Sequence, residues 1–330
     1  LQSGDNDTGN DFLDTLPGSI GDYVWDDLDG DGIQDAGEVG VTNVTVTLYD
    51  STTSVVDTTT SDASGFYLFT NVAPDSGYFV NFTEPGGYTF TLPNVGSDVT
   101  DSDADVTTGD AAPITILAAE VNTNQDAGVY IPATIAGSVL LDIDGQGDFD
   151  AGIDTNGIAG AVVTLYDSAS NFVGAVTTAV DGAYAFTNLP PGDYFVTEDN
   201  APGYDSTGDS DGGPNVDRVD VPDLQSGDND TGNDFLDTLP GAIGDYVWDD
   251  LDGDGIQDAG EVGVTNVTVT LYDSTTSVVD TTTTDASGFY LFTNVAPDSG
   301  YFVNFTEPGG YTFTLPNVGS DVTDSDADVT

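Results

Sequence analysis

Residues 44–49 read Val-Thr-Val-Thr-Leu-Tyr, and apolar and polar side chains alternate along this stretch. A period of two is typical of a β-strand with one face in a core and the other in solvent. Residues 162–166, Val-Val-Thr-Leu-Tyr, carry a similar pattern. The two stretches therefore predict half-buried strands in two different parts of the chain.

Further short strands are expected on both sides of the first stretch, separated by turn-forming residues such as those in Pro85-Gly86-Gly87. We expect them at 20–25, 54–60, 65–71, 77–83, 88–92, 112–118 and 124–131. About seven short strands in roughly 110 residues, without a helical period, are typical of a β-sandwich. The predicted fold is all-β, a tandem array of Greek-key (prealbumin or immunoglobulin-like) β-sandwich domains, with little helix.

The array is predicted from internal repetition. Residues 1–107 recur as 224–330, and the copies differ only where Ser19 and Ser61 become Ala242 and Thr284. A long fixed period indicates a repeat architecture. We call the repeating domains A and B, and predict A at 18–132, B at 133–240 and a second A at 241–330.

In this register, residues 1–17 correspond to the last strand of a preceding B domain, and the second A domain stops before its own last strands. Two interpretations are open. The chain is a continuous array sampled off its boundaries, which we favour because the orphan strand is B-type whereas the gap is A-type. Alternatively, separate subunits exchange donor strands.

The charge of the chain excludes several partners. Fifty-nine acidic residues face a single base, Arg218, giving a net charge of -58. Nucleic acid and anionic lipid are bound through Lys and Arg, so both are excluded as partners. No apolar run approaches the roughly 18 residues of a spanning helix, so we expect no membrane insertion in this segment. Fifteen Tyr and 16 Phe are enough to build a folded core.

The chain contains no Cys, His or Lys. Thiolates, imidazoles and amines supply most nucleophiles and general bases, so most enzyme mechanisms are excluded. A glycosidase-like carboxylate pair is the one catalytic device that this composition permits, and no pair stands out from the acidic background. The chain is therefore not expected to be an enzyme.

The sharpest motif is residues 27–38, Asp-Leu-Asp-Gly-Asp-Gly-Ile-Gln-Asp-Ala-Gly-Glu, which fit the twelve-residue calcium loop at every position. The expected ligands are Asp27, Asp29, Asp31, the Ile33 carbonyl, Asp35 and Glu38. The second copy supplies Asp250, Asp252, Asp254, the Ile256 carbonyl, Asp258 and Glu261. Several converging carboxylates repel one another until a hard cation binds, so calcium is the expected cofactor.

The B domain carries a weaker version of this loop. Its candidate ligands are Asp142, Asp144, Gln146, the Asp148 carbonyl and Asp150. Ile153 stands where the bidentate Glu belongs, and Asp154 lies one place later. Asp154 is a possible substitute, and the sequence leaves the occupancy of this loop open.

Two further acidic clusters are either calcium sites or solvated loops. The first contains Asp101 and Asp103, with copies Asp324 and Asp326 and the B analogues Asp209 and Asp211. The second contains Asp5, Asp7 and Asp11, with copies Asp228, Asp230 and Asp234. The spacing of the acids suits oxygen ligation but does not decide between the two interpretations.

Together these stretches resemble the B-type repeats of serine-aspartate repeat (Sdr) bacterial surface proteins, relatives of the Cna B-type, prealbumin-like sandwich. The resemblance is carried by residues 20–25, 27–38, 40–41, 44–48, 65–69, 85–88 and 101–103. It covers the A domain over its full length and the B domain more loosely.

The resemblance implies domains that bind several calcium ions and stack into stalks on the cell surface. Many Cna B-type relatives are stapled by a Lys-Asn isopeptide bond, which a chain without Lys cannot form. We therefore expect a calcium-stabilised, extracellular filament or adhesin stalk, with neighbouring copies of itself and Ca²⁺ as partners. The alternatives are an adhesive or carbohydrate-binding module, with exposed aromatic side chains such as Tyr23 as contacts, and a donor-strand-exchanged pilus-like subunit.

Overall fold

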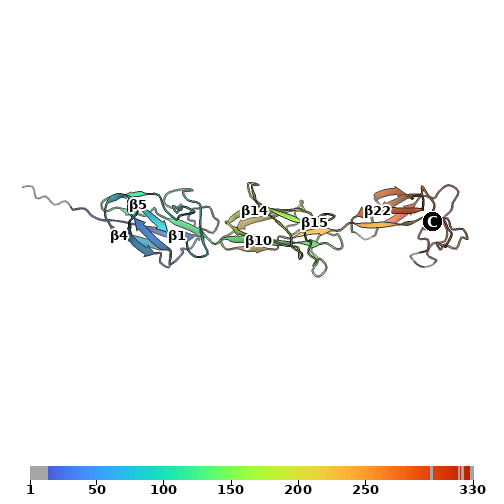
Figure 1. Ribbon diagram of the computed structural model, residues 1–330, viewed down its shortest axis with the longest axis horizontal. Coiled ribbons are helices and arrows are strands. Elements are labelled where there is room, and N and C mark those ends of the chain that lie inside the picture. Colours follow the sequence, from blue (N-terminus) through green and yellow to red (C-terminus); the bar gives the residue numbers. More distant parts are fainter. Residues whose placement is uncertain (1–13, 298–299, 319, 321–322, 328–330) are drawn as a thin grey trace, which may run out of the picture.

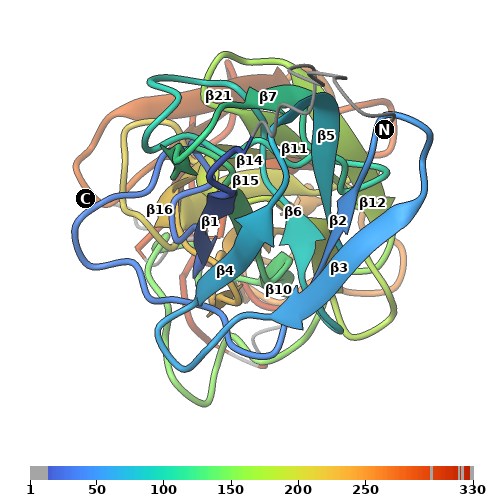
Figure 2. The same ribbon diagram turned by 90° about the vertical axis from the view of Figure 1, so that its left-hand side faces the viewer.

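The computed structural model describes residues 14–297, 300–318, 320 and 323–327, and these residues form β-strands and no helix (Figure 1). The all-β prediction is confirmed. Three groups of strands follow one another along the long axis of the molecule, and the end-on view superimposes them (Figure 2). We call these groups the first, second and third unit. The predicted orphan strand at 1–17 lies mostly outside the described residues.

The strands of the three units have the following bounds. The first unit contains β1 (Gly18–Asp26), β2 (Thr45–Tyr49), β3 (Val55–Thr60), β4 (Phe66–Val72), β5 (Asp75–Phe82), β6 (Thr89–Phe90), β7 (Ile114–Ile116), β8 (Val121–Asn122) and β9 (Ala127–Tyr130). The second contains β10 (Ala133–Leu141), β11 (Val162–Asp167), β12 (Phe172–Thr177), β13 (Ala183–Leu189), β14 (Gly192–Asp199), β15 (Asp205–Asp209), β16 (Arg218–Leu224), β17 (Asn229–Thr231) and β18 (Phe235–Thr238). The third contains β19 (Gly241–Tyr246), β20 (Thr268–Tyr272), β21 (Val278–Thr283), β22 (Phe289–Val295) and β23 (Phe302–Phe305).

Each of the first two units is a sandwich of two sheets. In the first unit the orders are β4-β1-β9-β6, with β8 also on β1, and β3-β2-β5-β7. The second unit repeats them as β13-β10-β18-β15, with β17 on β10, and β12-β11-β14-β16. The last strand region runs parallel to the first strand in both units, as β9 on β1 and β18 on β10. This parallel pairing joins segments about 100 residues apart and positions the acidic residues described below.

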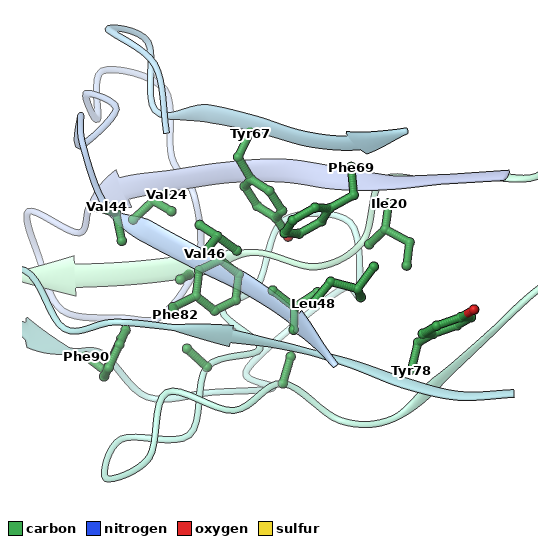
Figure 3. Packing of buried hydrophobic residues seen from close by; sticks show 14 of the residues in the cluster. Ile20, Val24, Val44, Val46, Leu48, Tyr67, Phe69, Tyr78, Phe82 and Phe90 are labelled. Carbon is green, nitrogen blue, oxygen red and sulfur yellow. The ribbon is translucent and has the colours of Figure 1, made fainter. Parts of the chain in front are cut away.

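The core of the first unit lies between its two sheets. On β4, buried Tyr67 and Phe69 alternate with exposed Leu68 and Thr70, which explains why this segment forms a half-buried strand. Tyr67 and Phe69 face Phe82 and other side chains of the β2–β5 sheet (Figure 3). The ring of Tyr67 meets that of Phe82 edge-on with centroids 5.6 Å apart. Aromatic pairs of this geometry add about 0.5–1.5 kcal/mol to the area that they bury.

The second unit places two acids where the first unit has apolar core residues. In the pairing with the neighbouring strand, Glu198 lies opposite Val163 as Phe82 lies opposite Val46. Likewise, Asp237 pairs with β10 where Val129 pairs with β1. Both acids are at least 95% buried, Glu198 at 5% and Asp237 at 0% exposure, and within the described residues their carboxyl oxygens have no hydrogen-bond partner other than each other's carboxyl.

Burial, together with the neighbouring Asp237 carboxyl, raises the pKa of Glu198 to about 9. Burial also raises the pKa of Asp237 to about 6. Because both pKa values exceed their ordinary values, the folded unit holds protons that the unfolded chain releases. The stabilisation is therefore complete at acidic pH and is lost as the pH rises through the folded pKa values.

A close backbone contact requires glycine next to β1. A Cβ on Gly40 would lie 1.8 Å from the carbonyl oxygen of Ser64, whereas one on the exposed Gly86 would meet nothing within 4 Å. We predict that Gly40→Ala lowers the free energy of unfolding by about 1–3 kcal/mol or more, because the backbone must shift. Gly86→Ala is the matched control. With Trp248 replaced by Phe, the fluorescence of Trp25 during urea unfolding reports the first unit, and equal midpoints for both variants would contradict the prediction.

The acid pair predicts a pH-dependent second unit. Between about pH 4.5 and pH 9 the parent unit should lose stability, since Glu198 must ionise in a buried site. Glu198→Gln removes that ionisation and should make the second unit more stable than the parent at pH 9 and nearly equal to it at pH 4. Hydrogen exchange of peptides from 133–238 measures this unit separately. Asp223→Asn, on an exposed acid of the same unit, should leave the pH profile of the parent unchanged.

Candidate metal centres

The loop 27–38 follows β1 and closes around its first and last acidic residues. Asp27 accepts hydrogen bonds from the amides of loop positions 4 and 6 through its two carboxylate oxygens, both at 2.9 Å. Glu38 accepts hydrogen bonds from the amides of positions 2 and 9, both at 2.8 Å. These bonds hold both carboxylates against the loop backbone, at its two ends.

The carboxylates of this loop converge. Single oxygens of Asp27, Asp29 and Glu38 lie within 4.8 Å of one another, and the same holds for Asp29, Asp31 and Asp35. Asp29 belongs to both groups, so the five carboxylates form two overlapping groups. All the predicted side-chain ligands of this loop are thus brought together. An all-oxygen donor set of this kind suits a hard cation such as Ca²⁺ or Mg²⁺.

A neighbouring segment fixes the middle of the loop. Ile33 forms an antiparallel bridge with Asp101, and the carbonyl of Gly32 accepts a hydrogen bond of 3.0 Å from the amide of Ser102. Gly32 has a φ of 82°, and a Cβ there would lie 2.4 Å from the carbonyl oxygen of Leu92. Only glycine fits this turn. The two acidic segments of the first unit therefore lie side by side.

Burial and like charge perturb the loop carboxyls. The pKa of Asp27 is raised, chiefly by burial, with a further contribution from the charge of Asp29. Burial likewise raises the pKa of Glu38 to about 7. Ionised carboxylates in such a site are unfavourable without a counter-charge.

The loop of the third unit has the same hydrogen bonds. Asp250 accepts from the amides of Gly253 and Gly255 at 2.8 and 2.9 Å. Glu261 accepts from the amides of positions 2 and 9, both at 2.8 Å. Asp250, Asp252 and Asp254 form one oxygen group within 4.8 Å, and Ile256 bridges to Asp324.

In the second unit, Asp154 makes the contacts that Glu38 makes in the first. Its two oxygens accept hydrogen bonds from the amides of Ile143 and Asp150, at 3.2 and 2.9 Å. These amides belong to positions 2 and 9 of the loop, although Asp154 itself is at position 13. Asp142 accepts from the amides of positions 4 and 6, as Asp27 does. The side-chain amide of Gln146 (Nε2) donates to Asp144 at 3.0 Å, so Gln146 offers a donor where the first loop has a carboxylate.

The second predicted cluster is part of a larger buried group in the first unit. Asp101 and Asp103 are buried, and one oxygen of Asp101 has no hydrogen-bond partner. The amide of Asp126 donates to Asp103 at 2.9 Å, and Asp22 lies beside Asp126. Burial raises the pKa of Asp103 to about 7 and that of Asp126 to about 9.

Sequence reasoning missed Asp22 and Asp126 as members of this group. Asp22 lies on β1, and Asp126 comes immediately before β9, which pairs in parallel with β1. The local sequence gives no spacing signal that links them. The one usable signal is the recurrence of Asp22 as Asp245 in the second copy. In the third unit, Asp245 and Asp326 both lie near the hydroxyl of Tyr290.

The second unit has fewer acids at the corresponding place. Ser138 N donates to Asp234 at 2.7 Å as Tyr23 N donates to Asp126 at 3.1 Å, so Asp234 is the counterpart of Asp126. Gly137 then stands at the position of Asp22, and Ser210 stands at that of Asp103. Of Asp22, Asp103 and Asp126, only Asp126 has an acidic counterpart in the second unit.

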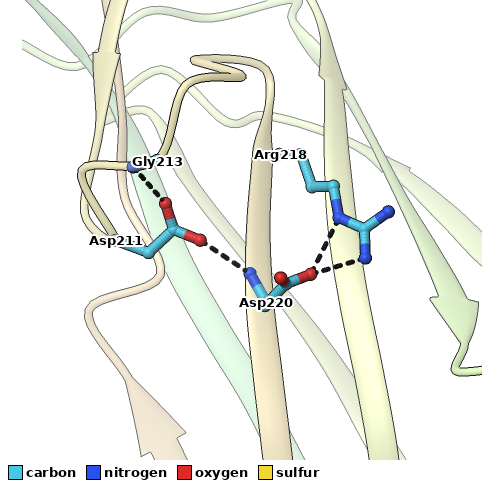
Figure 4. Close-up of polar contacts among 4 residues, drawn as sticks. All are labelled: Asp211, Gly213, Arg218 and Asp220. Atoms are coloured by element: carbon cyan, nitrogen blue, oxygen red, sulfur yellow. Dashed lines mark hydrogen bonds and ion pairs between the residues drawn. The ribbon is translucent and has the colours of Figure 1, made fainter.

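Asp209 and Asp211 are adjacent to this position in the second unit. Asp211 accepts hydrogen bonds from the amides of Gly213 and Asp220, and Asp220 forms an ion pair of 2.7 Å with Arg218 (Figure 4). Burial raises the pKa of Asp209 to about 6. The only base of the chain therefore lies close to this pair of acids, which disfavours a second cation there.

The third predicted cluster has different roles for its members. Asp5, Asp7 and Asp11 lie outside the described residues. Of their copies, Asp228 accepts from the amide of Gln225 at 2.9 Å and closes a turn, while Asp234 accepts from Ser138. Asp230 lies on β17. Within the described part of the chain, these three carboxylates do not form one of the compact oxygen groups found in the loops.

A cavity of about 460 Å³ lies in the third unit, lined by side chains that include Trp248, Tyr290 and Tyr311. The equivalent surface of the first unit is covered by β9, which pairs with Val24–Asp26, and Trp25 is fully buried there. The cavity is therefore not a feature that the repeated fold preserves from unit to unit.

Comparison with known proteins finds one match in each of the three units. A family model described as the SdrD B-like domain matches residues 18–129, 133–235 and 241–330. The chain is 37% identical to serine-aspartate repeat-containing protein D of Staphylococcus aureus, over 96% of this chain and 23% of that protein. It is 36% identical to serine-aspartate repeat-containing protein F of Staphylococcus epidermidis, over 92% of this chain and 18% of that protein. The chain thus spans a quarter or less of the length of these relatives.

Among solved structures, the chain is similar to BcpA, the major pilin subunit of Bacillus cereus, with a TM-score of 0.36 and 12% identity over 94% of this chain and 95% of that chain. It is also similar to the Bacillus anthracis TIE protein, with a TM-score of 0.34 and 15% identity over 94% of this chain and 49% of that chain. In the described residues, no helix suited to crossing a membrane is present. The three matched segments confirm the resemblance inferred from the sequence, and the chain belongs to the SdrD B-like domain family, whose members are extracellular structural repeats of surface proteins and not enzymes.

Proposed function

We propose that this segment is a calcium-stabilised part of an extracellular stalk or filament. The observation that carries the proposal is the group of carboxylate oxygens of Asp27, Asp29 and Glu38 within 4.8 Å, at the end of a buried strand. Binding of a cation to the folded state alone adds stability by mass action. In a chain with a net charge of -58, it also offsets repulsion that would otherwise favour unfolding.

The donor set favours calcium over other metals. A chain without His or Cys offers only oxygen ligands, which excludes most zinc and copper sites. The loop provides five carboxylates and one backbone carbonyl, with glycine at the sharp turn, as calcium loops of this length do. Magnesium prefers to keep several waters and needs a stricter octahedral geometry. Extracellular calcium modules have affinities of about 10⁻⁴–10⁻³ M, which would suit this location.

Further calcium sites are proposed with different support. The loop at 250–261 repeats the first, and the loop of the second unit is completed by Asp154. Asp101 and Asp103, together with Asp22 and Asp126, are proposed as a second site in the first unit because an oxygen of Asp101 is buried without a partner. Asp324 and Asp326 are proposed as its copy. We expect the weakest binding at Asp209 and Asp211, next to Arg218, and at the separated Asp228, Asp230 and Asp234.

The stalk role rests on the linear succession of the units. We propose unit boundaries at 18–132, 133–240 and 241–330, with each unit touching only its sequential neighbours (Figure 1). Neighbouring copies of the repeat are then the principal partners. Repetition of near-identical units multiplies length, whereas a binding or catalytic function needs one site.

The first loop predicts a calcium-dependent stability. Asp29→Asn, which keeps the one oxygen that accepts the amide of Asp31, should remove one site from the calcium stoichiometry measured by titration calorimetry of the metal-free chain. It should also remove about 2.7 kcal/mol of stabilisation at a calcium concentration 100 times the Kd. In EDTA, however, the variant should be at least as stable as the parent, because one of several repelling charges is gone.

That crossover separates a calcium ligand from a residue that merely supports the fold, whose loss would destabilise the chain in both buffers. Asp57→Asn is the matched control, because Asp57 lies exposed on β3. The proposal fails if EDTA leaves the thermal stability of the parent unchanged, or if Asp57→Asn and Asp29→Asn alter the calcium stoichiometry equally.

In the second unit, the structure of the loop predicts that Asp154 replaces the usual Glu. Asp154→Ala should abolish calcium binding at this loop, whereas Ile153→Ala, at the formal twelfth position, should leave it intact. Ile153 is 45% exposed, so its truncation costs little stability. Calcium-dependent protection from hydrogen exchange within 142–154 measures the effect. Equal protection in the two variants would show that Asp154 is not a ligand.

A further inference from the structure

The hydroxyl of Ser226 joins the first unit to the second. It donates a hydrogen bond to Oδ1 of Asp26 at 2.6 Å and accepts one from the amide of Ile131 at 2.8 Å. Ser226 lies between β16 and β17 of the second unit, while Asp26 ends β1 of the first unit and Ile131 is in the linker. One side chain therefore ties the second unit both to the linker and to the body of the first.

The same turn also contacts the acidic loop of the first unit. The amide of Ser226 donates to the carbonyl of Leu28 at 2.9 Å, and the amide of Leu28 in turn donates to Glu38 at 2.8 Å. On the other side of the loop, a Cβ on Gly30 would lie 3.1 Å from the carbonyl oxygen of Pro191 of the second unit. The loop at 27–38 is thus part of the junction between the two units.

The first unit has an alanine where the second has Ser226. The turns at 117–120 and 225–228 are equivalent, because Glu120 accepts from the amide of Leu117 at 2.6 Å as Asp228 accepts from that of Gln225 at 2.9 Å. The third residue of each turn donates to the linker that precedes its own unit, from Ala119 to Leu16 and from Gly227 to Ile131. The second residue is Ala118 in one turn and Ser226 in the other.

The residue that accepts the hydrogen bond from Ser226 also differs between the units. Asp26 is the last residue of β1, and Leu141 is the last residue of β10. Their amides make equivalent hydrogen bonds, to Val39 at 2.9 Å and to Asn156 at 2.8 Å. Leu141 packs against the core of the second unit. The A-to-B junction of this chain pairs Asp26 with Ser226. At a B-to-A junction the corresponding residues would be Leu141 and the counterpart of Ala118, which falls beyond residue 330 for the third unit.

We propose that Ser226 and Asp26 form a latch specific to the A-to-B junction, so that the array alternates between a polar, latched junction and an apolar, unlatched one. The contact of the fourth loop residue with a proline is common to both junctions. A Cβ on Gly145 would lie 2.5 Å from the carbonyl oxygen of Pro297, as that on Gly30 meets Pro191. What distinguishes the junctions is the hydrogen bond, not this shared packing.

The matched pairs also fix the order of the units. An A unit following an A unit would set Asp26 against an alanine, and the carboxylate would lose its donor. A B unit following a B unit would set the serine hydroxyl against Leu141. A partly buried polar group without a partner is unfavourable, so both wrong orders are disfavoured. This inference goes beyond the proposed calcium role, since neither residue of the latch is a proposed ligand.

Spin labels can test the latch in the full 330-residue chain, which has no native cysteine. Val56→Cys on β3 and Val173→Cys on β12 place labels at exposed, equivalent positions of the first two units. Electron–electron double resonance then measures the width of the distance distribution across the A-to-B junction. In saturating calcium, Ser226→Ala should broaden the distribution, whereas Ser226→Thr, which keeps the hydroxyl, and Ser168→Ala, elsewhere on the second unit, should leave the parent width.

The double variant Asp26→Leu with Ser226→Ala carries the B-to-A pair at this junction. Its distance distribution should be as broad as that of Ser226→Ala alone. Once Ser226 is replaced, Asp26→Leu removes no further hydrogen bond across the junction. An unchanged width in Ser226→Ala, with the calcium stoichiometry intact, would overturn the latch while leaving the proposed function standing. If instead EDTA left the stability of the parent unchanged and Ser226→Ala broadened the distance distribution, the latch would stand and the proposed calcium function would fail. Broadening in Ser168→Ala equal to that in Ser226→Ala would also overturn the latch.

Discussion

The near absence of positive charge is the constraint on which the rest of the structure depends. With one Arg against 59 acids, a buried carboxylate in this chain cannot rely on an ordinary salt bridge. Backbone amides, a shared proton or a bound cation are the remaining means of compensation. The first is visible directly, and a raised carboxyl pKa points to the second. Asp27 and Glu38 each accept two amide hydrogen bonds, and Glu198 has its pKa raised to about 9 by burial.

The A and B units meet this constraint differently. The A unit gathers its acids at one end of the sandwich, around the loop and the segment at 97–103, and keeps Phe82 and Val129 in the core. The B unit keeps an acidic loop, closed by Asp142 and Asp154, but has Gly137 and Ser210 at the positions of Asp22 and Asp103. It buries Glu198 and Asp237 at the core positions of Phe82 and Val129. Acids gathered around a loop can be compensated by a bound cation, whereas acids in a core that has no cation are compensated by protonation, which depends on pH. The two units thus place their buried acids in different parts of the same fold.

Local patterns in the sequence were sufficient to predict the strands and the loops. The alternation at 44–49 and the spacing of Asp27, Asp29 and Asp31 depend on neighbouring residues, and the structure retains both. Asp22 and Asp126 were missed because they meet only through the parallel pairing of β1 with β9, about 100 residues apart. Asp154 was recognised as a possible substitute, but its equivalence to Glu38 depends on an extra residue being accommodated in the loop. No local spacing reports a contact between Asp26 and Ser226, which are 200 residues apart.

The loop at 27–38 lies beside the chain path that joins the first unit to the second. In the proposed stalk, tension would pass from β9 through residues 131–132 into β10, and the loop contacts Ser226 and lies near Pro191 beside this path. An interaction that holds the loop closed therefore also limits bending between the units, because the amide of Leu28 bonds to Glu38 and its carbonyl bonds to the next unit. Under the proposed calcium function, cation binding within the loop and orientation of the following unit would share Leu28, so a change in one would alter the free energy of the other.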